Sequence, residues 1–177
     1  MNVVSNAGPL IALGKLGHLP LLARLYGMIR IPREVYHEVV SNGLRLGAAE
    51  APAVEALVRQ AAIQVVDVAM PVSLPNWAQP LDAGEIEVLV LAQQQVTDWV
   101  LIDNEHARHA ARGLGLPLKG TVGLLLAAWR HHHLSFHTFG QLMETIKRRP
   151  DLWISARLCE RALEASAPRS QSACRRG

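Results

Sequence analysis

The sequence predicts an α/β fold, with a central parallel sheet that is flanked by helices. Short apolar runs alternate with helical patterns along most of the chain. This order is typical of parallel strands that are joined by right-handed helical crossovers. The run WVLI at 99–102 is short, continuous and apolar, as expected of a strand that is covered on both faces. The predicted fold class rests on these two observations.

Length and composition fit one domain at 1–166. The chain has 177 residues, of which 50% are hydrophobic, so it can bury a core of its own. Residues 167–177 lack apolar periodicity and are predicted to be a disordered basic tail. The net charge of +3 is a weak indication of nucleic-acid binding, since part of the excess lies in this tail.

The composition also excludes several protein classes. Two cysteines give neither a disulfide framework nor metal-ligand spacing, so a reducing cytoplasm is the expected location. No apolar run approaches the ~20 residues of a membrane helix, and we expect no membrane association.

The first half of the chain divides at turn residues. Pro9 suits the first turn of a helix and Asn6 can cap it, while Asn42 and Gly43 are predicted to end a later helix. The expected elements are a strand at 2–5, a mostly helical stretch at 10–26 with a break at 17–20, a strand at 28–31, a helix at 33–41, a helix at 49–62 and a strand at 63–68.

The second half is organised around residues 81–111. Asp82 followed by Glu85 is a capping-box pattern, which predicts the start of a helix. The expected elements are a loop at 69–80, a helix ending near 94, a strand at 99–102, a helix at 105–112, a brief strand at 116–118, and helices at 121–133, 138–149 and 151–166.

Four polar side chains are expected to converge at one edge of the sheet. Asn6 and Asp103 each follow a strand, and the carboxyl ends of parallel strands share an edge. Glu38 lies about two turns into the helix after the second strand, and Glu85 lies in the first turn of the helix before the fourth. Three carboxylates and an amide resemble a site for Mg²⁺ or Mn²⁺. Such a site can activate water and stabilise the leaving oxygen of a phosphodiester.

Six stretches carry a resemblance to a known family. They are VVSNAGPLIAL at 3–13, IPREVYHEVV at 31–40, LDAGEIEVLVLA at 81–92, LIDNEHARHAA at 101–111, LKGTVGLLLAAW at 118–129 and DLWISARLCERAL at 151–163. Together they resemble the PIN-domain family, and in particular a subgroup related to VapC-type toxins. The resemblance implies a three-layer fold with a central parallel sheet, a Mg²⁺ or Mn²⁺ site, and cleavage of RNA. It also implies an antitoxin protein as a partner and a homodimer.

The family's site residues carry over by position. Its four acidic positions fall on Asn6, Glu38, Glu85 and Asp103. The resemblance implies that these four residues are metal ligands. It also implies that the three carboxylates among them are the catalytic residues. Thr121 matches a polar position that lines the same pocket.

The sequence departs from the family pattern at two positions. Asn6 is an amide where the family has a carboxylate, and Asn104 stands where many relatives have a second acid. Arg108 and Arg112, one turn apart beside Asp103, are candidates for phosphate contacts.

Each site residue also has a simpler interpretation. Glu85 can serve only in a capping box, and Asn6 only as a helix cap. Glu38 follows Glu34 by one turn and can simply face solvent. Arg108 and Arg112 can form an exposed helix face. The run at 131–133 is three adjacent histidines that point in different directions, so we interpret it as a solvated helix end.

Two functions remain open at this point. The first is a metal-dependent endoribonuclease, the toxin of a toxin–antitoxin pair. The second is a catalytically weakened module that binds RNA or protein. A receiver-type domain using Asp103 is set aside, because no paired acid cluster follows the first strand. The high apolar fraction also predicts a self-association or partner surface, around 10–26 or on the helices after Thr138.

Overall fold

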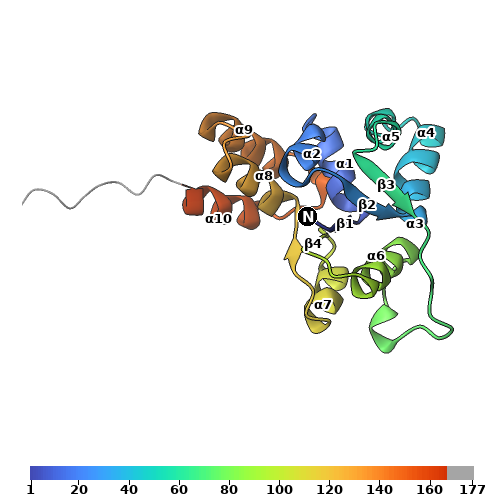
Figure 1. Cartoon of the computed structure of the whole chain (residues 1–177). Helices are drawn as coiled ribbons and strands as arrows, with labels where there is room; N and C mark the ends of the chain where they lie inside the picture. Colours follow the sequence, from blue (N-terminus) through green and yellow to red (C-terminus); the bar gives the residue numbers. More distant parts are fainter. Residues whose placement is uncertain (167–177) are drawn as a thin grey trace, which may run out of the picture.

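Five parallel strands form one sheet in the computed structural model, which describes residues 1–166 (Figure 1). The strands are β1 (Val3–Ser5), β2 (Ile29–Pro32), β3 (Ile63–Val66), β4 (Trp99–Leu101) and β5 (Leu118–Lys119). All neighbouring strands run parallel, so the predicted α/β fold with a parallel sheet is confirmed. The tail that we predicted to be disordered, 167–177, lies outside the described residues.

The strand order reverses between β1 and β4. The order across the sheet is β3-β2-β1-β4-β5, so the chain first builds outward from β1 in one direction and then in the other. Val3 pairs with Trp99 and Ser5 with Leu101, and these two central strands therefore end level with each other. Open α/β sheets bind ligands at such a switch point, outside the carboxyl ends of the strands.

Helices cover both faces of the sheet and make three layers. In Figure 1, α6 and α7 lie on one face and α1, α2 and α8 on the other. The α-helices are α1 (Ala7–Lys15), α2 (Pro20–Tyr26), α3 (Arg33–Tyr36), α4 (Gly43–Leu46), α5 (Ala51–Arg59), α6 (Ala83–Gln94), α7 (Glu105–Gly113), α8 (Thr121–Arg130), α9 (Phe136–Lys147) and α10 (Ala156–Ser166). A π-helical turn, η1 (His37–Asn42), joins α3 to α4, and η2 (Asn76–Ala78) and η3 (Pro150–Leu152) are 3-10 turns.

The core is built from the apolar faces of the strands and the covering helices. Val4, Ile29, Ile31, Val100 and Leu101 are fully buried, which explains why the central strands are continuous apolar runs instead of alternating ones. No helix in the described part of the chain is both long and apolar enough to cross a membrane.

Several predicted boundaries are wrong. The helix after β2 does not end at Gly43, which has a helical φ of −57°. It continues to Leu46 and ends at Gly47, which adopts the left-handed conformation with a φ of 72°. Strand β5 starts at Leu118 instead of 116. The last helix starts at Ala156 instead of 151, because a 3-10 turn and Trp153 (φ 50°) interrupt the chain before it.

Candidate functional site

Asp103 lies two residues after β4, and its carboxylate is hydrogen-bonded to the first residue of α8. The Thr121 backbone N–H donates to Asp103 Oδ1 over 2.8 Å, and the Thr121 hydroxyl donates to Oδ2 over 2.6 Å. Thr121 is itself fully buried. Burial raises the pKa of Asp103, whereas the two Thr121 hydrogen bonds and the charge of Arg108 act in the opposite direction. The carboxylate is thus fixed in orientation and costly to ionise.

Two glycines allow the backbone to approach this carboxylate closely. A Cβ atom on Gly120 would lie 2.8 Å from Asp103 Oδ1, and one on Gly8 would lie 3.4 Å from Asp103 Cβ. Gly8 is in the first turn of α1, and Gly120 directly precedes α8. Asp103 therefore sits between the starts of two helices, where backbone N–H groups and helix dipoles favour negative charge.

Asn6 ends β1 beside Asp103 and holds an unused acceptor. Its backbone N–H donates to Leu101 O over 2.9 Å, which joins the ends of the two central strands. Asn6 occupies the N-cap position of α1, but its side chain makes no capping hydrogen bond. It is 6% exposed, and its Oδ1 is buried without a hydrogen-bond partner among residues 1–166. A buried acceptor of this kind is costly unless a ligand or water occupies it.

Glu85 starts α6 through the predicted capping box. Its N–H donates to Asp82 Oδ1 over 2.7 Å, and the Asp82 N–H donates to Glu85 Oε2 over 3.3 Å. Glu85 is nevertheless only 4% exposed, which a capping role does not require. Burial and the charge of Asp82 raise the pKa of Glu85. The capping interpretation is therefore correct, and the residue that completes the cap is also a buried carboxylate at the start of α6.

Glu38 approaches this helix start from the π-helical turn. Its Oε2 lies 3.7 Å from where a Cβ atom on Gly84 would be. Glu38 is exposed on one side, yet partial burial, followed by the charges of Asp82 and Glu85, raises its pKa. Glu38, Asp82 and Glu85 thus form an acidic group in which the negative charges oppose one another. Asp82 was predicted only as a cap, although its place three residues before Glu85 already puts its charge near that carboxylate.

The acidic group and Asp103 lie at the same edge of the sheet. Helix α6 precedes the parallel strand β4, so it must run back across the sheet and start at the carboxyl edge. In agreement, the charge of His106, in the first turn of α7, acts on Glu85 and lowers its pKa. Within residues 1–166, however, no three His, Cys, Asp or Glu side chains are placed so that they could hold a metal ion together. The joint metal site therefore stays a prediction.

The oxygen donors at this edge nevertheless fit a hard cation. Mg²⁺ takes only one or two carboxylates directly and keeps several waters, so it does not need three acids in contact. The unpartnered Asn6 Oδ1 is a neutral oxygen donor. Asp103 and Glu85 are carboxylates whose ionised form the protein alone disfavours, and a bound cation would favour it.

The two arginines at this edge are already engaged. Arg108 Nη1 donates to the Ile102 carbonyl over 2.8 Å, and its Nε lies 3.7 Å from Glu105 Oε2. Arg112 pairs with Glu105 Oε1 at 2.9 Å on an exposed face. Asn104 caps α7, because its Oδ1 accepts hydrogen bonds from the backbone N–H groups of His106 and Ala107 at 2.8 and 3.2 Å. The amide at that position therefore has a structural role. Phosphate contacts by the arginines remain a prediction.

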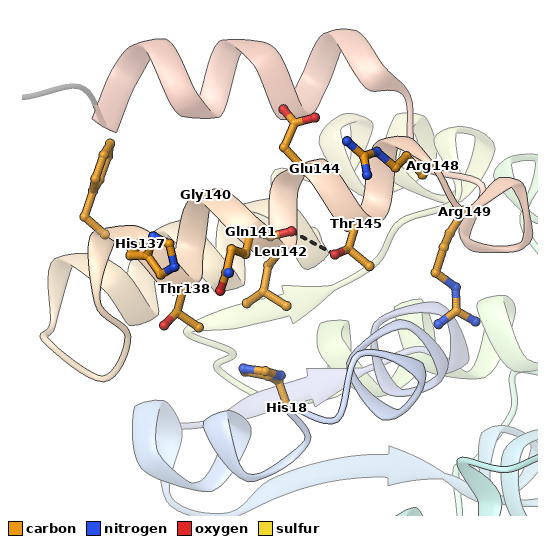
Figure 2. Close-up of a pocket in the computed structure, with 11 residues that line it drawn as sticks. His18, His137, Thr138, Gly140, Gln141, Leu142, Glu144, Thr145, Arg148 and Arg149 are labelled. Carbon is orange, nitrogen blue, oxygen red and sulfur yellow. Dashed lines mark hydrogen bonds between the residues drawn. The ribbon is translucent and has the colours of Figure 1, made fainter.

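A cleft lies elsewhere in the described residues. It has a volume of about 830 Å³ and separates α9 from the turn between α1 and α2, where His18 faces Thr138 and Leu142 (Figure 2). None of the predicted site residues lines it. The histidine run at 131–133 also lies outside this cleft, directly after α8. The candidate site is thus defined by the strand ends and not by this cleft.

One comparison with known proteins gives a match. A family model described as a PIN domain matches residues 2–167. Neither a curated protein nor a solved structure matches the chain.

Proposed function

Because this chain belongs to the PIN-domain family, we propose that it is a metal-dependent endoribonuclease. The observation that carries the proposal is the position of Asn6 and Asp103, which follow the two central strands at the strand-order reversal. There a buried amide oxygen, which has no hydrogen-bond partner within residues 1–166, directly follows β1, and a fixed carboxylate follows β4. Open α/β sheets place their ligand sites at this point.

The residues of the edge would share the work as follows. Asn6, Glu38, Glu85 and Asp103 would hold Mg²⁺ or Mn²⁺, directly or through waters. When bound, the ion would supply a Lewis acid for the phosphodiester and make water easier to deprotonate. Thr121 holds Asp103 in one orientation through both carboxylate oxygens. Arg108 and Arg112 would lie along the path of the RNA backbone.

The biological setting that we propose is a toxin–antitoxin pair. It rests on the resemblance to VapC-type toxins, which also supports an antitoxin partner and a homodimer. Several large apolar side chains stay exposed and are available for such contacts, among them Leu46, Val72, Val96 and Trp153.

An RNA cleavage assay with and without Mn²⁺ tests the proposal. The wild type is expected to cut RNA only with the ion, and Asp103→Ala is expected to cut at a background rate. Glu55→Ala is the matched control, because Glu55 lies on α5 and pairs with Arg59 of the same helix. Cleavage that survives chelation, or that Asp103→Ala leaves intact, would contradict the proposal.

A binding module is the second candidate, and specific contacts favour it. Both oxygens of Asp103 already accept hydrogen bonds from Thr121, and the first ligand position is a neutral amide. If the wild type binds a labelled RNA by fluorescence anisotropy but never cuts it with Mg²⁺ or Mn²⁺, this candidate replaces the nuclease.

A further inference from the structure

Lysine is rare in this chain, and the three lysines have different surroundings. They are Lys15, Lys119 and Lys147. Lys15 Nζ lies 3.0 Å from Asp151 Oδ2, and Lys147 Nζ lies 3.1 Å from Glu144 Oε1. Within the described part of the chain, Lys119 has neither an ion pair nor a side-chain hydrogen bond. Its ammonium is therefore the one that no carboxylate stabilises.

Aromatic rings enclose the head of Lys119 instead. Its Nζ lies 3.9 Å from the centre of the Trp99 ring and 5.4 Å from the centre of the Tyr26 ring. Lys119 pairs with Leu101 across β4 and β5, and Trp99, two residues before Leu101, points to the same face of the sheet. A Cβ atom on Gly123 of α8 would lie 3.0 Å from Lys119 Cγ, so the stem is pressed between helix and sheet.

Lys119 is half-buried, and the ring of Tyr26 beside it is buried. Tyr26 is 8% exposed, and its hydroxyl has no hydrogen-bond partner among residues 1–166. Burial raises the pKa of Tyr26 to about 12. Burial also lowers the pKa of Lys119, whereas the hydrogen bond to Glu144 raises that of Lys147. Stacking on the ring faces favours the ammonium, but it replaces neither the lost water nor a carboxylate.

We propose that Lys119 is the preferred acyl-acceptor site of this protein, modified at Nζ by acyl phosphates. The lone pair of the neutral amine attacks the carbonyl carbon of the donor. The bond from that carbon to the phosphate oxygen breaks, and phosphate leaves with the electron pair. One proton of the original ammonium passes to water before the attack, the second proton that the nitrogen loses passes to the leaving phosphate, and the product is an uncharged amide. Lysines that lose their charge readily on burial are the ones used as nucleophiles.

The other two lysines serve as controls within the same molecule. Each is held in an ion pair with a carboxylate, which must open before its Nζ can attack. Asp151→Asn removes one partner of Lys15 and leaves Lys119 untouched, since Asp151 lies in η3 beside α1. Acylation of Lys15 should therefore rise in this variant while that of Lys119 stays the same.

The test uses the full chain and acetyl phosphate at limiting exposure. Peptide mass spectrometry gives the initial acetylation rate of each lysine, and circular dichroism confirms that each variant is folded. Lys119 is expected to react at least about three-fold faster than Lys15 and Lys147, as a modest difference in the fraction of neutral amine would produce. Equal or slower reaction of Lys119 in the folded protein would overturn the proposal.

Two further measurements tie the preference to the fold. In urea the three rates should become similar, because the contacts of Lys119 with the aromatic rings and the ion pairs of Lys15 and Lys147 are lost together. A preference that persists in urea would show that the local sequence causes it and would overturn the structural argument. In Lys119→Arg, acetylation summed over the lysine peptides should fall by more than half, and a smaller loss would show that Lys119 is not the main lysine acceptor.

Discussion

Asn6 is the residue at which this chain departs most from an acidic metal site. Replacing Asn6 with Asp adds one negative charge beside the proposed ion. At an effective dielectric near 20, a unit charge at ~4 Å from a divalent ion gains roughly 8 kcal/mol before desolvation is subtracted. Dehydration of the new carboxylate and repulsion from Asp103 and the other acids remove most of this gain. We expect about ten-fold tighter Mn²⁺ binding by titration calorimetry.

The same substitution is expected to behave differently without the ion. The position is buried, so Asn6→Asp should unfold at a lower temperature than the wild type in chelator, and Mn²⁺ should remove this difference. Unchanged metal affinity in Asn6→Asp would show that Asn6 is not a ligand, and its orphan oxygen would then need water as its partner.

Glu85 makes the stability of the metal-free protein depend on pH. Burial raises its pKa in the folded chain above the ordinary value of 4.5. Its contribution to stability is therefore complete below the unfolded pKa and is lost as pH rises through the folded pKa. Glu85→Gln keeps a capping-box residue but cannot ionise. In chelator, the melting temperature of Glu85→Gln minus that of the wild type should grow between about pH 4 and about pH 7.

A surface carboxylate provides the control for this pH dependence. Glu55→Gln on α5 should show a difference from the wild type that stays nearly constant over the same range. A constant difference for Glu85→Gln as well would mean that Glu85 ionises in the fold as easily as in the unfolded chain.

At the scale of elements, the loop before α8 depends on Gly120. Its φ of −100° is open to any residue, so the constraint is steric and not conformational. A Cβ atom would lie 2.8 Å from Asp103 Oδ1 and 3.2 Å from Arg108 Nη1. Gly120→Ala should therefore displace the Asp103 carboxylate, lower the unfolding free energy by about 1–3 kcal/mol, and weaken Mn²⁺ binding.

Gly140 in α9 is the matched glycine. Nothing lies within 4 Å of a Cβ atom placed there, and alanine in a helix interior is favoured over glycine by about 0.5–1 kcal/mol. Gly140→Ala should thus stabilise the protein in urea unfolding and leave metal binding unchanged. Equal effects of the two substitutions would contradict the close packing against Asp103.

How far the sequence predicts the structure also differs between elements. The strands were found because both faces are buried, which makes them continuous apolar runs such as 99–102. The continuation of the helix beyond Gly43 was missed, because a helical glycine is held there by packing: a Cβ atom would meet Ala51 Cβ at 2.8 Å. Such a tertiary contact has no local signal.

The site shows the same limit. Asn6 and Asp103 were singled out because each follows a strand. Their adjacency depends on β1 pairing with β4 across a long stretch of chain, and periodicity does not specify that pairing. The aromatic contacts of Lys119 were missed for the same reason, since Trp99 of β4 and Tyr26 of α2 are far apart in the sequence.

At the scale of the whole molecule, charge is unevenly distributed. The chain has a net charge of +3, but its predicted site gathers acids whose ionisation the metal-free fold disfavours. A basic protein whose predicted site is acidic attracts a polyanion over its surface, and a bound cation would offset the negative charge that repels a phosphate from that site.

Binding of a divalent ion should consequently stabilise the entire domain. At an Mn²⁺ concentration 100 times the dissociation constant, linkage gives about 2.7 kcal/mol, which for a chain of this size is a rise of about 5–11 °C in melting temperature. Differential scanning calorimetry of the wild type with Mn²⁺ and with chelator measures this rise. Asp103→Asn should lose it, because the amide cannot offset the charge of the ion, whereas Glu55→Gln should retain it. If the wild type itself gains nothing with Mn²⁺ or Mg²⁺, the edge of the sheet does not hold a cation, and the fixed Asp103 carboxylate is only a cap for α8.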